Sequence, residues 1–175
     1  MKNTMEATPK TITVAMSLAL VAILLGFVLG GFFGLAESSV KQHLSDSGSE
    51  VLESVYGGDI AKKDAVVSKS FEYLKRAHMH GGAIGSVALG SILALIMLCS
   101  LGPVEKLSAL SLGAGAILYS GFWLLAGLSA PGLGSTGAAK EALSFVAIPG
   151  AGLCILGVCG TLYSVLKTGF SKATT

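Results

Sequence analysis

Long apolar runs separated by short polar segments dominate the hydropathy pattern of this chain. Four of them exceed about 20 residues, the length that an α-helix needs to cross ~30 Å of hydrocarbon. They cover residues 11–36, 77–102, 107–128 and 143–166. Charged residues or breaking pairs such as Gly102-Pro103 bound them. The pattern predicts an all-α fold, an integral membrane four-helix bundle formed as a single domain over residues 1–175.

The one long polar segment, residues 37–76, lies between the first and second apolar runs. Its first part is rich in serine and in charges of both signs, and Gly57-Gly58-Asp59 marks a break. Four positions after this break follow a 4-3-4 spacing that is typical of one helix face: Val67, Phe71, Leu74 and His78. We therefore expect a polar, partly helical loop, with a second helix that begins outside the membrane near residues 62–70.

The first apolar run could be mistaken for a cleaved signal peptide, because Gly34-Leu35-Ala36 resembles a small-residue cleavage site. However, the run is longer than the 7–15 apolar residues of a signal core. We expect it to be retained as a transmembrane helix.

Composition supports a membrane location. Apolar residues make up 52% of the chain and charged residues only 13%, whereas soluble domains have roughly 25% charged residues. The lipid bilayer is thus the expected environment. The net charge of +2 comes without a basic stripe, so we expect no nucleic-acid partner.

Lysine density predicts the orientation. With four spans both termini share a side, and that side carries five lysines in short segments: Lys2, Lys10, Lys106, Lys167 and Lys172. The basic residues on the other side are spread over a long loop and balanced by acids. The positive-inside rule then places both termini in the cytoplasm, and we expect a bacterial inner membrane.

Small residues recur at every fourth position of the first run, at Ala22, Gly26, Gly30 and Gly34, and Gly81 and Gly85 begin a similar ridge on the second. Such ridges allow helix backbones to approach closely in a membrane. They predict either tight packing within the chain or a docking face for another subunit.

All three histidines, His43, His78 and His80, lie on the side of the polar segment. Residues two apart on a helix point about 200° away from each other, so His78 and His80 cannot chelate one ion unless the helix breaks at Gly81-Gly82. His78 continues the apolar stripe, and we expect it to face the interior with Tyr119, Ser120 or a ligand as its partner. His80 falls on the opposite side, with Tyr73 and Arg76, and we expect it to point away from the interior.

Histidine binds haem iron, copper and zinc and donates hydrogen bonds to quinone carbonyls. Aromatic residues near the outer end of the third run form either an ordinary interfacial belt or the wall of a quinone-head pocket. The candidate cofactor-binding residues are His78, His80, Tyr119, Ser120 and Trp123. The candidate metal ligands are His43, His78 and His80. The alternative is that these histidines only anchor the helix end at the membrane surface.

The order of four features resembles a family of small uncharacterised four-helix membrane proteins of bacteria and mitochondria. The features are Phe33-Gly34-Leu35-Ala36, His78 or His80, Tyr119-Ser120-Gly121-Phe122, and Pro149-Gly150. The histidine that follows Phe-Gly-Ala in the family is missing here, and the polar segment is longer. The family has no established activity, so the resemblance implies the architecture alone.

These features favour a non-catalytic membrane subunit of a larger assembly, an electron-transfer complex whose other subunits are its partners, with haem, quinone or a metal at the outer histidines. One alternative is a stand-alone small-solute transporter or channel. Another is a copper-handling membrane protein, which would need His43 to join His78 and His80.

Overall fold

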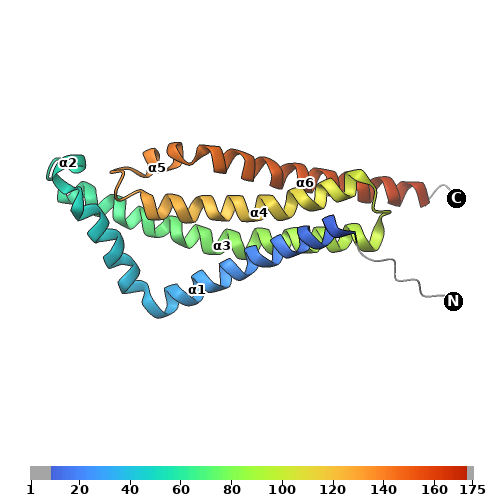
Figure 1. Ribbon diagram of the computed structural model, residues 1–175, viewed down its shortest axis with the longest axis horizontal. Coiled ribbons are helices and arrows are strands. Elements are labelled where there is room, and N and C mark those ends of the chain that lie inside the picture. The colour runs from blue at the N-terminus through green and yellow to red at the C-terminus, as the bar shows by residue number, and fades with distance from the viewer. Residues whose placement is uncertain (1–8, 173–175) are drawn as a thin grey trace.

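The computed structural model describes residues 9–172 and consists of helices connected by short turns (Figure 1). In chain order these are α1 (Lys10–Glu50), α2 (Leu52–Tyr56), α3 (Ile60–Leu98), α4 (Pro103–Ser129), α5 (Thr136–Ala142) and α6 (Ser144–Lys172). Within the described range there is no β-strand. α1, α3, α4 and α6 are each long and apolar enough to cross a membrane. The predicted all-α four-helix membrane bundle is confirmed.

α3 and α4 form the centre of the bundle. α1 packs along α3 and α4, and α6 packs mainly along α4 (Figure 1). α1 begins and α6 ends at the same end of the bundle, as four spans require. α3 is therefore covered by α1 on one face and by α4 on another, and this arrangement decides what its side chains meet.

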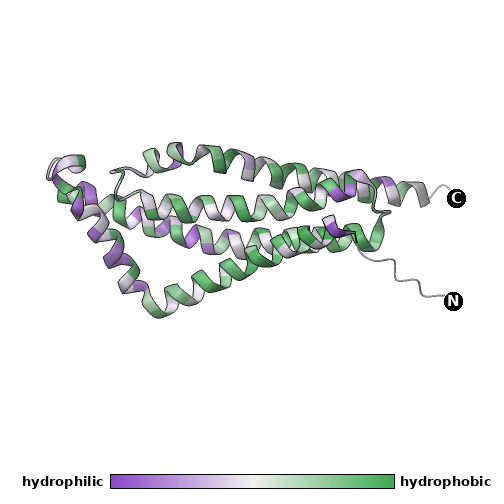
Figure 2. Ribbon diagram, in the orientation of Figure 1, coloured by the Kyte–Doolittle hydropathy of each residue, from purple (hydrophilic) through white to green (hydrophobic). Residues whose placement is uncertain are grey.

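The polar segment 37–76 is more helical than expected. α1 continues to Glu50, and α3 already begins at Ile60, where the Asp59 side chain accepts a hydrogen bond from the Lys62 backbone N–H at 2.9 Å. Gly57, with φ of 63°, ends the intervening α2 in the left-handed conformation. We call residues 37–76 the polar hairpin; its hydrophilic colouring contrasts with the spans in Figure 2.

Side-chain pairs one turn apart support the helix outside the membrane. Lys41 pairs with Glu37, and Gln42 donates to Asp46 at 2.7 Å. Such pairs stabilise exposed helices by a few tenths of a kcal/mol each. The polar composition that indicated a loop is thus compatible with a solvated helix.

α1 bends at Ala36, whose φ of −138° and ψ of 29° are not helical. Before the bend α1 buries small residues against α3 and α4, and after it Val40, Leu44 and Gly48 return to α3. Around the bend the chain stands away from the bundle, since Leu35 is 92% exposed and a side chain at Gly34 would meet no other atom within 4 Å. The two arms of α1 therefore enclose space against α3 and α4.

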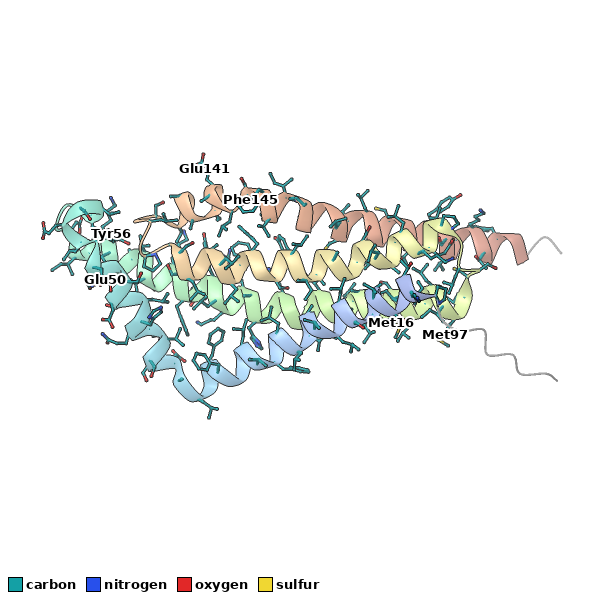
Figure 3. The ribbon with its side chains drawn as sticks, in the orientation of Figure 1. Met16, Glu50, Tyr56, Met97, Glu141 and Phe145 are labelled. Atoms are coloured by element: carbon teal, nitrogen blue, oxygen red, sulfur yellow. The ribbon has the colours of Figure 1, made fainter. Side chains whose placement is uncertain are left out.

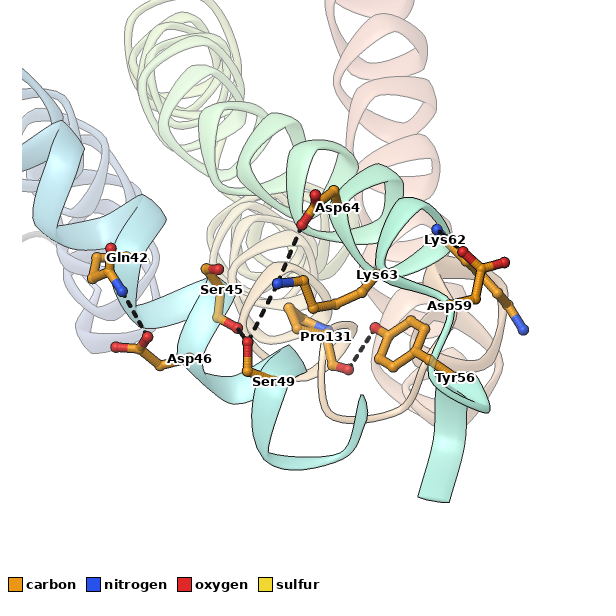
Figure 4. A network of polar contacts seen from close by, with 10 residues as sticks. All are labelled: Gln42, Ser45, Asp46, Ser49, Tyr56, Asp59, Lys62, Lys63, Asp64 and Pro131. Atoms are coloured by element: carbon orange, nitrogen blue, oxygen red, sulfur yellow. Dashed lines mark hydrogen bonds and ion pairs between the residues drawn. The ribbon is translucent and has the colours of Figure 1, made fainter. Parts of the chain in front are cut away.

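The tip of the polar hairpin is tied to the connection between α4 and α5. The buried Tyr56 hydroxyl donates to the Pro131 carbonyl at 2.7 Å, and burial raises the pKa of Tyr56 (Figure 4). Lys63 of α3 donates to Ser49 Oγ of α1 at 3.3 Å, and it also pairs with Asp64 of α3 at 3.2 Å. These bonds hold the far arm of α1 in place.

Figure 3 shows where the labelled side chains lie along the length of the bundle. Glu50 and Tyr56 lie at the hairpin end, and Met16 and Met97 lie toward the opposite end. A free cysteine commonly packs as a small buried hydrophobe. Cys99 and Cys154 are half-buried, but Cys159 is exposed, because the part of α6 that carries it is covered by neighbouring helices on only one side.

Candidate functional site

His78 faces α1 and not α4. Its side chain is half-buried, and Nδ1 lies 2.6 Å from the Gly26 carbonyl oxygen. A carbonyl can only accept, so Nδ1 carries the hydrogen in this contact. Gly30 provides the room, since a Cβ there would lie 2.5 Å from the imidazole.

Neither Tyr119 nor Ser120 is the hydrogen-bond partner of His78. The expectation that it faces the protein holds, but the Gly26 backbone takes the place assigned to Tyr119 or Ser120. The reason is that the stripe of Phe71, Leu74 and His78 packs against α1, as the edge contact between His78 and Phe33 at 6.4 Å also indicates. His78 therefore joins two helices.

His80 lies on the α4 side of α3. Its ring is 5.2 Å from that of Tyr119 and 6.0 Å from that of Trp123, and the side chain is half-buried. The contrast between a buried His78 and an outward His80 is thus not observed. Because α3 is central, both of its faces are covered.

An aromatic cluster surrounds His80. Tyr73 of α3 contacts Trp123 edge-on at 4.9 Å, and Phe122 and Tyr119 pack on the same indole. Arg76 lies over the Trp123 ring at 4.8 Å. Ser120 Oγ and Trp123 Nε1 are buried and have no hydrogen-bond partner among the described residues. The structure thus brings together His80, Tyr119 and Trp123, and leaves His78 outside this cluster.

The three histidines do not converge on one point. His43 is exposed on α1, His78 faces α1 from α3, and His80 faces α4. In the part of the chain that the structure describes, no group of three or more His, Cys, Asp or Glu side chains could hold a metal ion. The proposed three-histidine metal site is not assembled in this structure.

An apolar cavity of about 310 Å³ lies inside the bend of α1. We call it the bend cavity. Its lining comes from both arms of α1, from α3 and from α4: Leu29, Phe32, Phe33, Ser39, Val40, His43, Leu74, Leu124 and Leu128. At its rim, Ser39 and His43 also line a polar surface groove with Gln42 and Asp46. The apolar bend cavity thus lies next to a polar surface groove, and His43 lines both.

No protein-family model, curated protein or solved structure matches this chain. The resemblance to small four-helix membrane proteins therefore stays an expectation.

The bend cavity can accept a molecule with an apolar body and a polar end. Its volume lies at the lower limit of the roughly 300–1,000 Å³ that small-molecule sites occupy. Phe32 is 54% exposed and Leu128 43% exposed, so part of the lining reaches the lipid-facing surface. Sequence reasoning missed this cavity and found only His43 of its lining, since the cavity depends on the bend at Ala36.

Proposed function

We propose that this chain is a non-catalytic integral membrane subunit of a larger electron-transfer assembly, and that it holds an isoprenoid quinone in the bend cavity. The observation that carries the proposal is the meeting of an apolar cavity with a histidine at its rim.

The chemistry of a quinone suits this lining. Its ring and isoprenoid tail are apolar, and its two carbonyl oxygens accept hydrogen bonds. Leu74, Leu124 and Leu128 offer apolar contact, and Phe33 offers a ring face or edge. His43 can donate to a carbonyl at the polar rim. A ligand that arrives through the bilayer would enter between the exposed Phe32 and Leu128.

Binding can be followed with the chain's own fluorescence. Trp123 is the single tryptophan, and its neighbour Leu124 lines the bend cavity. We expect a benzoquinone with a decyl side chain to quench Trp123 emission saturably when the protein is in lipid nanodiscs. His43→Leu should weaken binding about three- to tenfold, the equivalent of one hydrogen bond. Leu128→Phe should weaken it more, because the larger ring fills the cavity.

Leu125→Phe is the matched control. Leu125 lies on the same helix, is 48% exposed and does not line the bend cavity, so its replacement should leave the titration unchanged. The proposal fails if His43→Leu and Leu128→Phe bind like the parent. It also fails if decanol competes as well as the quinone does, because the cavity would then accept any alkyl chain.

We further propose that the protein lies in a bacterial inner membrane with both termini in the cytoplasm. The lysine density of the short segments supports this orientation. In a chain whose native cysteines are replaced, a cysteine at Ser47 on the polar hairpin should react with an impermeant maleimide added to intact cells. A cysteine at Ser100, between α3 and α4, should react only after lysis; the reverse pattern would invert the orientation.

A further inference from the structure

Arg76 marks the boundary of the apolar part of α3. Between Arg76 and Glu105 the sequence contains no Asp, Glu, Lys or Arg. α3 ends at Leu98, 22 residues after Arg76, which corresponds to a helix length of about 33 Å. This length matches the ~30 Å hydrocarbon core of a bilayer. Arg76 therefore lies at the level of the lipid headgroups on the hairpin side.

The guanidinium of Arg76 is held by aromatic rings and not by a carboxylate. Its Cζ lies 4.8 Å from the centre of the Trp123 ring and 5.2 Å from that of Tyr73. The three ion pairs among the described residues use lysines: Lys41 with Glu37, Lys63 with Asp64, and Lys75 with Glu72. Arg76 forms no ion pair or hydrogen bond with another residue in this part of the chain.

This arrangement orients the donors of Arg76. Cation–π contact with two rings restrains the planar guanidinium, and its N–H groups stay available for two oxygens at once. Arg76 is exposed, so these N–H groups can be reached from the membrane surface. Phosphate is the group of matching geometry that gathers at this depth.

We propose that Arg76, whose guanidinium lies over the Trp123 and Tyr73 rings, binds the phosphate of an anionic phospholipid in the leaflet on the hairpin side. The neighbouring Lys75 is not an equivalent lipid-binding group, because its Nζ already lies 2.7 Å from the Glu72 carboxylate. The site is separate from the bend cavity, and the proposal does not depend on quinone binding.

The test uses the full chain released from mixed phosphatidylglycerol and phosphatidylcholine membranes and analysed by native mass spectrometry. We expect the parent to retain phosphatidylglycerol in preference to phosphatidylcholine. Arg76→Gln should lower the retained phosphatidylglycerol about fivefold. Lys75→Gln removes the adjacent charge, which is already paired. This variant should leave the amount of retained phosphatidylglycerol unchanged. Arg76→Lys should retain an amount between those of the parent and of Arg76→Gln, because lysine keeps the charge but lacks the planar fork of N–H groups.

A second measurement separates the lipid from a free anion. Adding phosphatidylglycerol to the protein in a neutral detergent should shift Trp123 emission, and inorganic phosphate should not. An equal shift with inorganic phosphate would overturn the lipid assignment. Equal losses in Arg76→Gln and Lys75→Gln would show a general charge effect and overturn the site. Arg76→Lys, which keeps the charge and is expected to fold, tests the role of the guanidinium fork: retention equal to that of the parent would also overturn the site.

Discussion

Gly26→Leu is expected to destabilise the bundle by about 3 kcal/mol, the upper part of the usual range for overpacking. A Cβ at Gly26 would lie 2.6 Å from the Gly82 backbone nitrogen and 3.0 Å from the His78 carbonyl oxygen. Backbone atoms cannot rotate away as a side chain can, so α1 would have to move from α3. That movement would also break the hydrogen bond from His78 to Gly26.

The measurement is reversible unfolding in detergent, followed by loss of helical circular dichroism. Gly34→Leu is the control on the same helix, since a Cβ there meets no atom within 4 Å and should cost little. If both variants unfold at the same denaturant concentration, the cost comes from leucine in α1 in general and the close contact with α3 is not what matters.

Gly115→Leu is expected to detach α6 from the bundle. A Cβ at Gly115 would lie 2.7 Å from the Cys154 backbone nitrogen and 3.0 Å from the Gly150 carbonyl oxygen. α6 packs chiefly on α4, so it has little other contact to hold it when this approach is prevented. We expect a loss of stability of about 3 kcal/mol.

Cys154 reports the separation directly, because it is half-buried at this contact. In a chain with Cys99 and Cys159 replaced by alanine, Gly115→Leu should raise the rate at which a maleimide labels Cys154. Gly121→Leu, also on α4 but with nothing within 4 Å of the added Cβ, should leave that rate unchanged. A rate that does not change in Gly115→Leu would contradict the observed packing of α6 on Gly115.

The close approach of Gly26 to α3 could be read from the sequence, because small residues four apart on an apolar helix have few other uses. How far the close contact extends along α1 could not be read from the sequence. Gly30 makes room for the His78 side chain, and Gly34 lies in the open. The exposure of Gly34 follows from the bend at Ala36, which no proline predicts.

The surroundings of the histidines could likewise be predicted only in part. Helical phase placed His80 with Tyr73 and Arg76, and His78 with Phe71 and Leu74, as the structure has them. Phase says which side chains share a face, and it does not say which neighbouring helix covers that face. With α3 between α1 and α4, the side thought to be outward became the contact with Tyr119 and Trp123.

The sequence by itself determined the four membrane-spanning helices, since hydropathy and length are properties of each segment alone and the bilayer imposes the same requirement on each. Only the tertiary structure decided where a ligand could sit. The bend cavity joins residues as distant in the chain as Leu29 and Leu128, and it exists because the far arm of α1 returns to α3 and is held there by Leu44, Lys63 and Tyr56. A cavity of this kind is formed by contacts between distant segments of the chain, and a local sequence pattern does not predict those contacts.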